Sequence, residues 1–106
     1  MRKNKSLPLT LSGKIWIYPG ESASWHFFTV PQKESAGIRN TYGPLARGWG
    51  SFPVQVALGE TVWTTSIFPD RSSGTYLLPL KAAVRKKEGV FDGDTITVQI
   101  TILVDG

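Results

Sequence analysis

Alternation of apolar and polar residues with a period of two constrains the fold of this chain more than any other feature. Four segments carry the pattern: residues 9–18, 52–58, 61–68 and 95–104. A β-strand places successive side chains on opposite faces, so each segment is expected to bury one face and expose the other. Two shorter runs rich in aromatic and aliphatic residues predict further strands at residues 25–30 and 75–78. Six strands separated by turns rich in proline, glycine and serine indicate a barrel or a sandwich.

Two segments break the alternation and carry the signals of helix boundaries. Residues 81–88 follow Pro79, contain good helix formers and end in basic residues before a glycine, as helices commonly do. Residues 32–40, which follow Pro31, show weaker signals for a second short helix. The expected fold class is therefore all-β, or mainly β. It is a small closed barrel or pseudo-barrel of about six to seven strands with two short capping helices.

The order of these elements predicts an internal duplication, with halves at about residues 9–58 and 59–106. Residues 17–22 resemble residues 67–72. In both halves a strand ending in proline, a helix, a glycine and another strand follow in the same order. The two helices would then cap opposite ends of the barrel. The alternative is convergence of ordinary turn and capping chemistry, because proline before a helix and glycine after it are common.

The net charge of +4 comes mainly from the beginning of the chain. Arg2, Lys3 and Lys5 lie within residues 1–6, and outside that segment nine Lys and Arg residues face eight Asp and Glu residues. We expect a disordered basic tail over residues 1–6 and a single barrel domain over residues 7–106. Affinity for nucleic acid comes mainly from several contacts between basic side chains and phosphates. The low charge of the domain therefore argues against this function.

Composition also restricts the metal chemistry and the location of the chain. Cysteine is absent, which excludes disulfides and thiolate metal sites. No run approaches the ~20 consecutive apolar residues that a membrane helix needs, and the N-terminus lacks the apolar core of a signal peptide. We expect a cytoplasmic protein with no membrane partner.

Residues suited to catalysis are scarce. His26 is the only histidine, and its place between aromatic residues on a strand favours a structural or surface role over that of a catalytic base. No nucleophile-elbow pattern accompanies the serines. Asp92 and Asp94 lack the rest of any metal-binding loop pattern, and a tight Gly-Asp turn accounts for them better. We therefore expect no enzyme, no cofactor and no metal site.

Large aromatic residues and nearby polar or basic groups make binding the better hypothesis. The candidate ligand-binding residues are Trp25, Trp49, Trp63, Thr65, Ser66, Tyr76, Lys81 and Arg85. Aromatic walls beside a lysine and an arginine suit a small anion, an acidic peptide or a stacked base. Alternatives remain open: Trp63 fits a core position, and Lys81 and Arg85 fit an ordinary solvated helix face. Trp49, between two glycines, is expected to be partly exposed.

Two resemblances to known families add to this interpretation. Residues 78–96 resemble the swapped-hairpin motif of AbrB-like and MazE-like proteins, with an apolar-Pro pair, an apolar-Arg pair and a Gly-Asp turn. Nearly the whole chain is similar to the domain of unknown function nineteen-oh-five, a bacterial family. The segments that carry this similarity are residues 25–28, 48–54, 61–69 and 76–85. The second resemblance implies a double-split β-barrel capped by helices, related to the AbrB-like barrel, and no established activity.

Three functions follow in order of preference. The first is a non-catalytic binding module for a small anionic ligand, a peptide or a partner protein. The second is an AbrB-like nucleic-acid-binding or antitoxin-type regulator, and the third is an enzyme of unknown class. The chain is expected to be a monomer or a homodimer.

Overall fold

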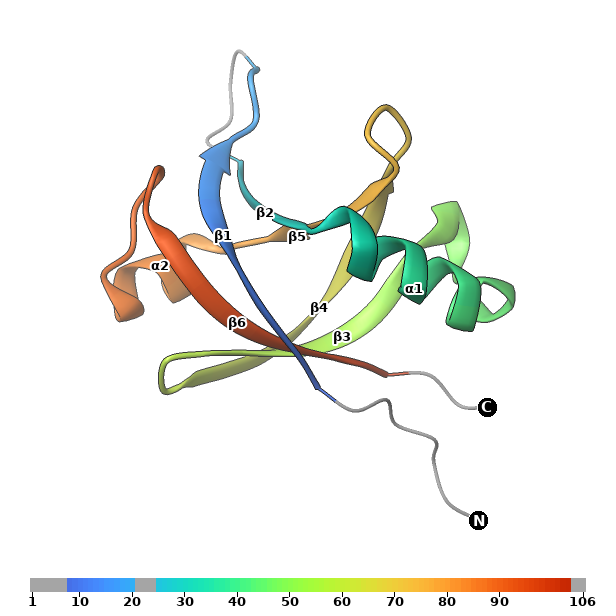
Figure 1. Ribbon diagram of the computed structural model, residues 1–106. Helices are drawn as coiled ribbons and strands as arrows, with labels where there is room; N and C mark the ends of the chain where they lie inside the picture. Colours follow the sequence, from blue (N-terminus) through green and yellow to red (C-terminus); the bar gives the residue numbers. More distant parts are fainter. Residues whose placement is uncertain (1–7, 21–24, 104–106) are drawn as a thin grey trace.

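The computed structural model, which describes residues 8–20 and 25–103, contains a closed barrel of antiparallel strands with a helix on each side (Figure 1). The strands are β1 (Leu9–Ile17), β2 (His26–Val30), β3 (Phe52–Leu58), β4 (Thr61–Asp70), β5 (Thr75–Pro79) and β6 (Thr95–Ile102). Their order around the barrel is β1-β2-β5-β4-β3-β6, and β6 pairs with β1 to close it. The predicted mainly β barrel is confirmed. The predicted basic tail at residues 1–6, and Val104 at the end of the last predicted strand, lie outside the described residues.

Both predicted helices are present. α1 (Gln32–Tyr42) follows Pro31, and α2 (Ala82–Glu88) follows Lys81. α2 ends at Gly89, whose φ of 67° gives the left-handed conformation that favours glycine. α1 runs two residues further than expected because Gly43 keeps a helical conformation and continues into the 3₁₀ turn η1 (Gly43–Leu45). Among the described residues, no helix has the length and apolar content needed to cross a membrane.

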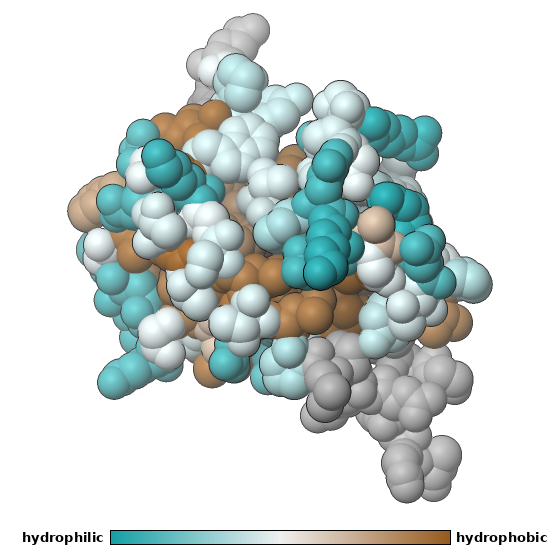
Figure 2. Space-filling model, viewed as in Figure 1, coloured by the Kyte–Doolittle hydropathy of each residue, from teal (hydrophilic) through white to brown (hydrophobic). Residues whose placement is uncertain are grey.

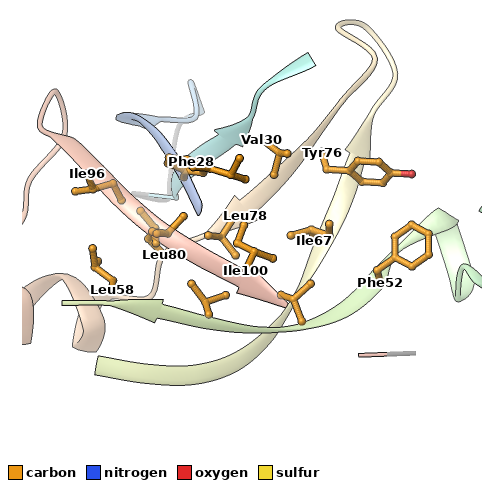
Figure 3. Close-up of a cluster of buried hydrophobic side chains, with 14 of the residues drawn as sticks. Phe28, Val30, Phe52, Leu58, Ile67, Tyr76, Leu78, Leu80, Ile96 and Ile100 are labelled. Atoms are coloured by element: carbon orange, nitrogen blue, oxygen red, sulfur yellow. The ribbon is translucent and has the colours of Figure 1, made fainter. Parts of the chain in front are cut away.

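The core lies inside the barrel and is built from alternate residues of the strands (Figure 3). In β3 and β6 every inward position is buried: Phe52, Val54, Val56, Leu58, Ile96, Val98, Ile100 and Ile102. Each such side chain contributes roughly 1.5–3 kcal/mol by leaving water. The helices close the core with Ile38 from α1 and Val84 from α2. Figure 2 shows hydrophobic side chains in a band across the middle of one face, with hydrophilic ones around it.

Hydrogen bonds from side chains attach the helices to the strands. Ser35 of α1 is fully buried, and its hydroxyl donates to the Val30 carbonyl at 2.9 Å and accepts the Tyr76 backbone N–H at 3.0 Å. Glu88, the last residue of α2, accepts a hydrogen bond of 2.5 Å from the Thr61 hydroxyl at the start of β4. These contacts fix where each helix lies against the barrel.

The strand order is unchanged, apart from its direction, when the two halves of the chain are exchanged. If β1 is exchanged with β4, β2 with β5 and β3 with β6, the order of strands around the barrel stays the same but is read in the opposite direction. The register agrees, since the pairs Phe28–Leu78 and Val30–Tyr76 lie symmetrically about the pair Thr29–Leu77. An approximate twofold axis therefore passes between β2 and β5. A duplication of the sequence itself stays a prediction.

The registers also show which residues of β1 and β4 are equivalent. Phe28 of β2 pairs with Ile15, whereas Tyr76, the twofold equivalent of Phe28, pairs with Pro69. Pro69 is thus equivalent to Ile15 and not to Pro19. The sequence likeness between residues 17–22 and 67–72 is therefore offset by four residues from the structural equivalence.

Candidate ligand-binding site

Three of the eight predicted site residues lie together. Trp25, Lys81 and Arg85 border a pocket of about 270 Å³ where β5 leads into α2. We call this pocket, whose remaining lining residues are His26, Pro79, Leu80 and Ala82, the α2 pocket.

Pairing of β2 with β5 brings these residues together from distant parts of the sequence. Phe27 pairs with Pro79, so the residue before β2 and the residues after β5 become neighbours. The Leu80 N–H continues this pairing by donating to the His26 carbonyl at 2.9 Å. Lys81 is the N-cap residue of α2 and Arg85 lies four residues later within the helix, and both line the pocket.

The guanidinium of Arg85 is oriented by the protein itself. Its Nε–H donates to the Leu80 carbonyl at 3.1 Å, in a partly buried position. Within residues 8–20 and 25–103, neither its two Nη groups nor the Lys81 ammonium has a hydrogen-bond or ion-pair partner. Two positive charges therefore line the pocket, and no carboxylate among the described residues is paired with either. A fixed guanidinium beside an ammonium suits a carboxylate or a phosphate.

Trp25 supplies an aromatic wall of the pocket. Its side chain is 58% exposed, and its ring stacks on Phe27 with centroids 6.2 Å apart and planes within 13°. Phe27 also contacts Trp16 and Tyr18. These three aromatic residues were not among the site residues predicted from the sequence. The available signal was Trp16, which occupies the polar face of the alternating pattern in residues 9–18.

Trp49 and Tyr76 lie at a second pocket, of about 430 Å³, which Arg39, Asp70 and Arg71 also line. We call it the η2 pocket, after the 3₁₀ turn η2 (Gly48–Gly50) that carries Trp49. Trp49 is 89% exposed, well beyond partial exposure, whereas Tyr76 is buried in the core. Among the described residues, Trp49 is the one residue other than glycine whose φ is positive, at 63°.

Hydrogen bonds and a close contact hold the η2 turn in place. The Gly50 N–H donates to the Arg47 carbonyl at 2.9 Å, and the Arg47 N–H donates to the Ser51 carbonyl at 2.8 Å. Gly50 has a φ of 78°, and a Cβ at this position would lie 3.2 Å from Cγ of Pro69. A substitution here would be strained by the positive φ and would press a Cβ against Pro69.

The remaining predicted residues, Trp63, Thr65 and Ser66, lie along β4 and line none of the pockets described here. Trp63 is half-buried and packs against the core. Its indole N–H is buried and has no acceptor among the described residues. Thr65 pairs with Val54 and Ser66 with Pro53 in the β3–β4 ladder. The structure thus distributes the eight residues over two pockets and a strand.

A pocket beside α1 occupies nearly the twofold-related position of the α2 pocket. Its lining includes Gln32, Lys33, Arg39 and Gly74. Here the protein uses its own polar groups: Arg39 Nη1 donates to the Gly74 carbonyl at 3.2 Å, and Gln32 Nε2 donates to the Ser73 carbonyl at 3.0 Å. The described residues of its lining include no aromatic side chain. The α2 pocket therefore differs from its counterpart by an aromatic wall and by guanidinium donors that have no acceptor in the part of the chain that the structure describes.

The residues considered for catalysis or metal binding have structural contacts. His26 is 8% exposed, and its backbone carbonyl accepts the Leu80 N–H. Asp94 accepts the Phe91 N–H at 2.8 Å, in a turn in which Gly93 has a φ of 88°. In the part of the chain that the structure describes, no three His, Asp or Glu side chains are grouped as a metal site requires.

Comparison with known proteins identifies the family. The family model described as Domain of unknown function (DUF1905) matches residues 12–100. No curated protein matches the chain significantly. The matched range extends from β1 to β6 and includes the α2 pocket. The chain therefore belongs to the DUF1905 family.

Proposed function

We propose that this barrel is a non-catalytic binding module whose α2 pocket takes a small anionic ligand with a carboxylate or phosphate group. One observation carries the proposal: Arg85 is oriented through Nε, and its two Nη groups and Lys81 have no acidic partner among the described residues. A charge-assisted hydrogen bond contributes about 1.5–3 kcal/mol. Two such contacts suffice for recognition of one anionic group.

The size of the pocket indicates the size of the ligand. Its volume of about 270 Å³ is slightly below the ~300–1,000 Å³ of pockets that enclose drug-sized ligands. We expect it to hold one anionic group and the atoms next to it, with a dissociation constant of about 10 µM to 1 mM.

The pocket lining supports binding without catalysis. Besides Lys81 and Arg85, the described residues of its lining include one ionisable residue, His26, and no Ser, Thr, Asp or Glu. Covalent and general acid–base catalysis usually need a nucleophile or a second acid within hydrogen-bond reach.

A titration of the full chain with inorganic phosphate and with acetate, followed by ¹H–¹⁵N NMR, tests this proposal. We expect saturable shifts at the Arg85 Nε–H and at the backbone amides of residues 80–85. Lys81→Gln and Arg85→Gln should each weaken binding about tenfold or more, because each removes a charged donor.

Lys86→Gln is the matched control, since it removes the same charge from the same helix at an exposed position outside the pocket. It should leave affinity within about twofold, as expected for screening of an exposed charge. Thermal unfolding of each variant checks that the fold is intact. Equal losses in all three variants, or no saturable shift with either anion, would contradict an anion site in this pocket.

A further inference from the structure

Four aromatic side chains form a cluster on the outside of the barrel, two in β1 and β2 and two in the residues that follow β1 and precede β2. Trp16, Tyr18, Trp25 and Phe27, which we call the aromatic platform, have neighbouring ring centroids 5.4–6.2 Å apart. They lie outside the barrel because they alternate with inward-facing Ile15, His26 and Phe28. The platform is therefore separate from the core.

Contacts within the platform fix its rings. The Trp16 indole N–H donates to the Thr29 hydroxyl at 2.8 Å. Phe27 contacts each of the other three rings. The Tyr18 backbone N–H donates to the Trp25 carbonyl at 2.8 Å, which holds the two chain segments together beyond the paired strands. Stacking on Phe27 and the hydrogen bond to its backbone carbonyl thus favour one orientation of the Trp25 ring.

The platform leaves aromatic surface in contact with water. Tyr18 is 50% exposed and Trp25 is 58% exposed. Single exposed apolar residues are common on proteins, but contiguous groups of them mark binding surfaces. Trp25 belongs to both the platform and the lining of the α2 pocket. A stacking surface therefore adjoins Lys81 and Arg85.

From this juxtaposition we infer that the ligand of the α2 pocket carries a flat ring close to its anionic group, as nucleoside monophosphates do. The inference rests on the proposed function and specifies its ligand class. The base would stack on the exposed face of Trp25, and the phosphate would lie between Lys81 and Arg85. Stacking of a base on an aromatic side chain is favourable and tolerant of base identity, so we expect little discrimination among bases.

The charge beside the platform favours a small molecule over a nucleic-acid strand. The α2 pocket offers one lysine and one arginine, which match a single phosphate. Lys86 and Lys87, in the last turn of α2, lie outside its lining. A strand of several nucleotides would require a basic groove that follows its backbone.

The experiment compares three probes on the full chain by ¹H–¹⁵N NMR: inorganic phosphate, adenosine and adenosine monophosphate. The monophosphate should bind about tenfold more tightly than either fragment, because a base stack and an anion contact act together. It should shift both the Trp25 indole N–H and the Arg85 Nε–H.

Trp25→Ala should weaken adenosine monophosphate binding about tenfold more than it weakens phosphate binding, because only the nucleotide loses a stacked base. Trp25→Leu provides a second variant that keeps apolar bulk, and it should show the same selective loss. Trp49→Ala, which removes an exposed tryptophan at the η2 pocket, is the matched control and should change neither affinity.

The outcomes separate this inference from the proposed function. If phosphate and the monophosphate bind equally and Trp25→Ala changes neither affinity, the inferred flat ring of the ligand is contradicted. The proposed anion site is then still supported. If no probe shifts Arg85, the anion site itself fails. If a thymidine decamer binds more than tenfold tighter than the monophosphate at ~150 mM salt, the ligand is a strand and the small-molecule class is overturned.

Discussion

At the scale of single residues, Ser35 shows how one buried hydroxyl joins three elements. It lies in α1, donates to the last carbonyl of β2 at Val30 and accepts the N–H of Tyr76 in β5. A buried backbone N–H without a partner costs about 1–3 kcal/mol. The Ser35 hydroxyl therefore supplies an acceptor for the Tyr76 N–H at the point where the β2–β5 ladder ends.

Ser35→Ala should destabilise the protein by about 1–3 kcal/mol, because it leaves the Tyr76 N–H unpaired in the interior. Urea unfolding followed by tryptophan fluorescence measures the change. Ser12→Ala is the control: its hydroxyl contacts Thr97 in an exposed position on the barrel surface, and its loss should cost under about 0.5 kcal/mol. A similar small cost for both substitutions would show that Ser35 does not support the ladder.

The candidate site shows which residue properties could be predicted from sequence. The Pro79 and Gly89 signals located α2, and with it Lys81 and Arg85. Trp25 was named for its aromatic side chain, but its neighbours depend on the pairing of β2 with β5. Alternation assigns a residue to a face and does not identify the partner strand. For the same reason Trp16 could be placed on the outside of a strand, whereas its contact with Phe27 could not be foreseen.

At the scale of elements, the turn between β4 and β5 depends on one carboxylate. Asp70 accepts hydrogen bonds from the Ser73 hydroxyl at 2.8 Å and from the Ser72 hydroxyl at 2.9 Å. These bonds, with that of Ser73 the largest influence, lower the pKa of Asp70 below its ordinary value of 3.8. The same turn presents the carbonyls of Ser73 and Gly74 to Gln32 and Arg39 of α1.

The lowered pKa of Asp70 gives this turn a pH dependence. Because the pKa of the folded state lies below that of the unfolded state, the stabilisation is present above about pH 4 and is lost as the pH falls through the folded pKa. A carboxyl-carbon NMR titration should place the Asp70 midpoint below 3.8. Asp70→Asn should make Tm depend slightly less on pH at acid pH. The effect should be small because the carboxylate is exposed to solvent. A midpoint at or above the ordinary value would contradict this account.

Prediction of the elements succeeded where side-chain period and boundary signals agreed. The strands followed from alternation, and α2 followed from proline before it and glycine after it. The predicted end of α1 was wrong by two residues, because Gly43 adopts a helical φ of −45° and ψ of −47°. Glycine permits left-handed geometry but does not impose it. The positive φ of Trp49 carried no sequence signal, because its flanking glycines indicate only a tight turn.

At the scale of the whole molecule, the approximate twofold symmetry brings two similar surfaces with different chemistry into one chain. The pocket beside α1 uses its arginine to hold the β4–β5 turn, whereas the Nη groups of Arg85 beside α2 have no acceptor among the described residues. The binding site that we propose therefore lies on one side only of an approximately symmetric barrel. Symmetry in strand order does not require symmetry in function, because function depends on the side chains at the site.

The charge distribution of the molecule leads to a last prediction, which concerns nucleic acid. Outside residues 1–6 the chain has nine basic and eight acidic residues, so few phosphates can be neutralised at once. Any binding to generic duplex DNA at ~50 mM salt should therefore disappear by ~200 mM, with a log–log slope no steeper than about −3. Fluorescence anisotropy of a labelled duplex measures this slope. A slope near −6 that Lys81→Gln and Arg85→Gln both reduce would instead assign the α2 surface to DNA, because each contact with a phosphate contributes about one unit.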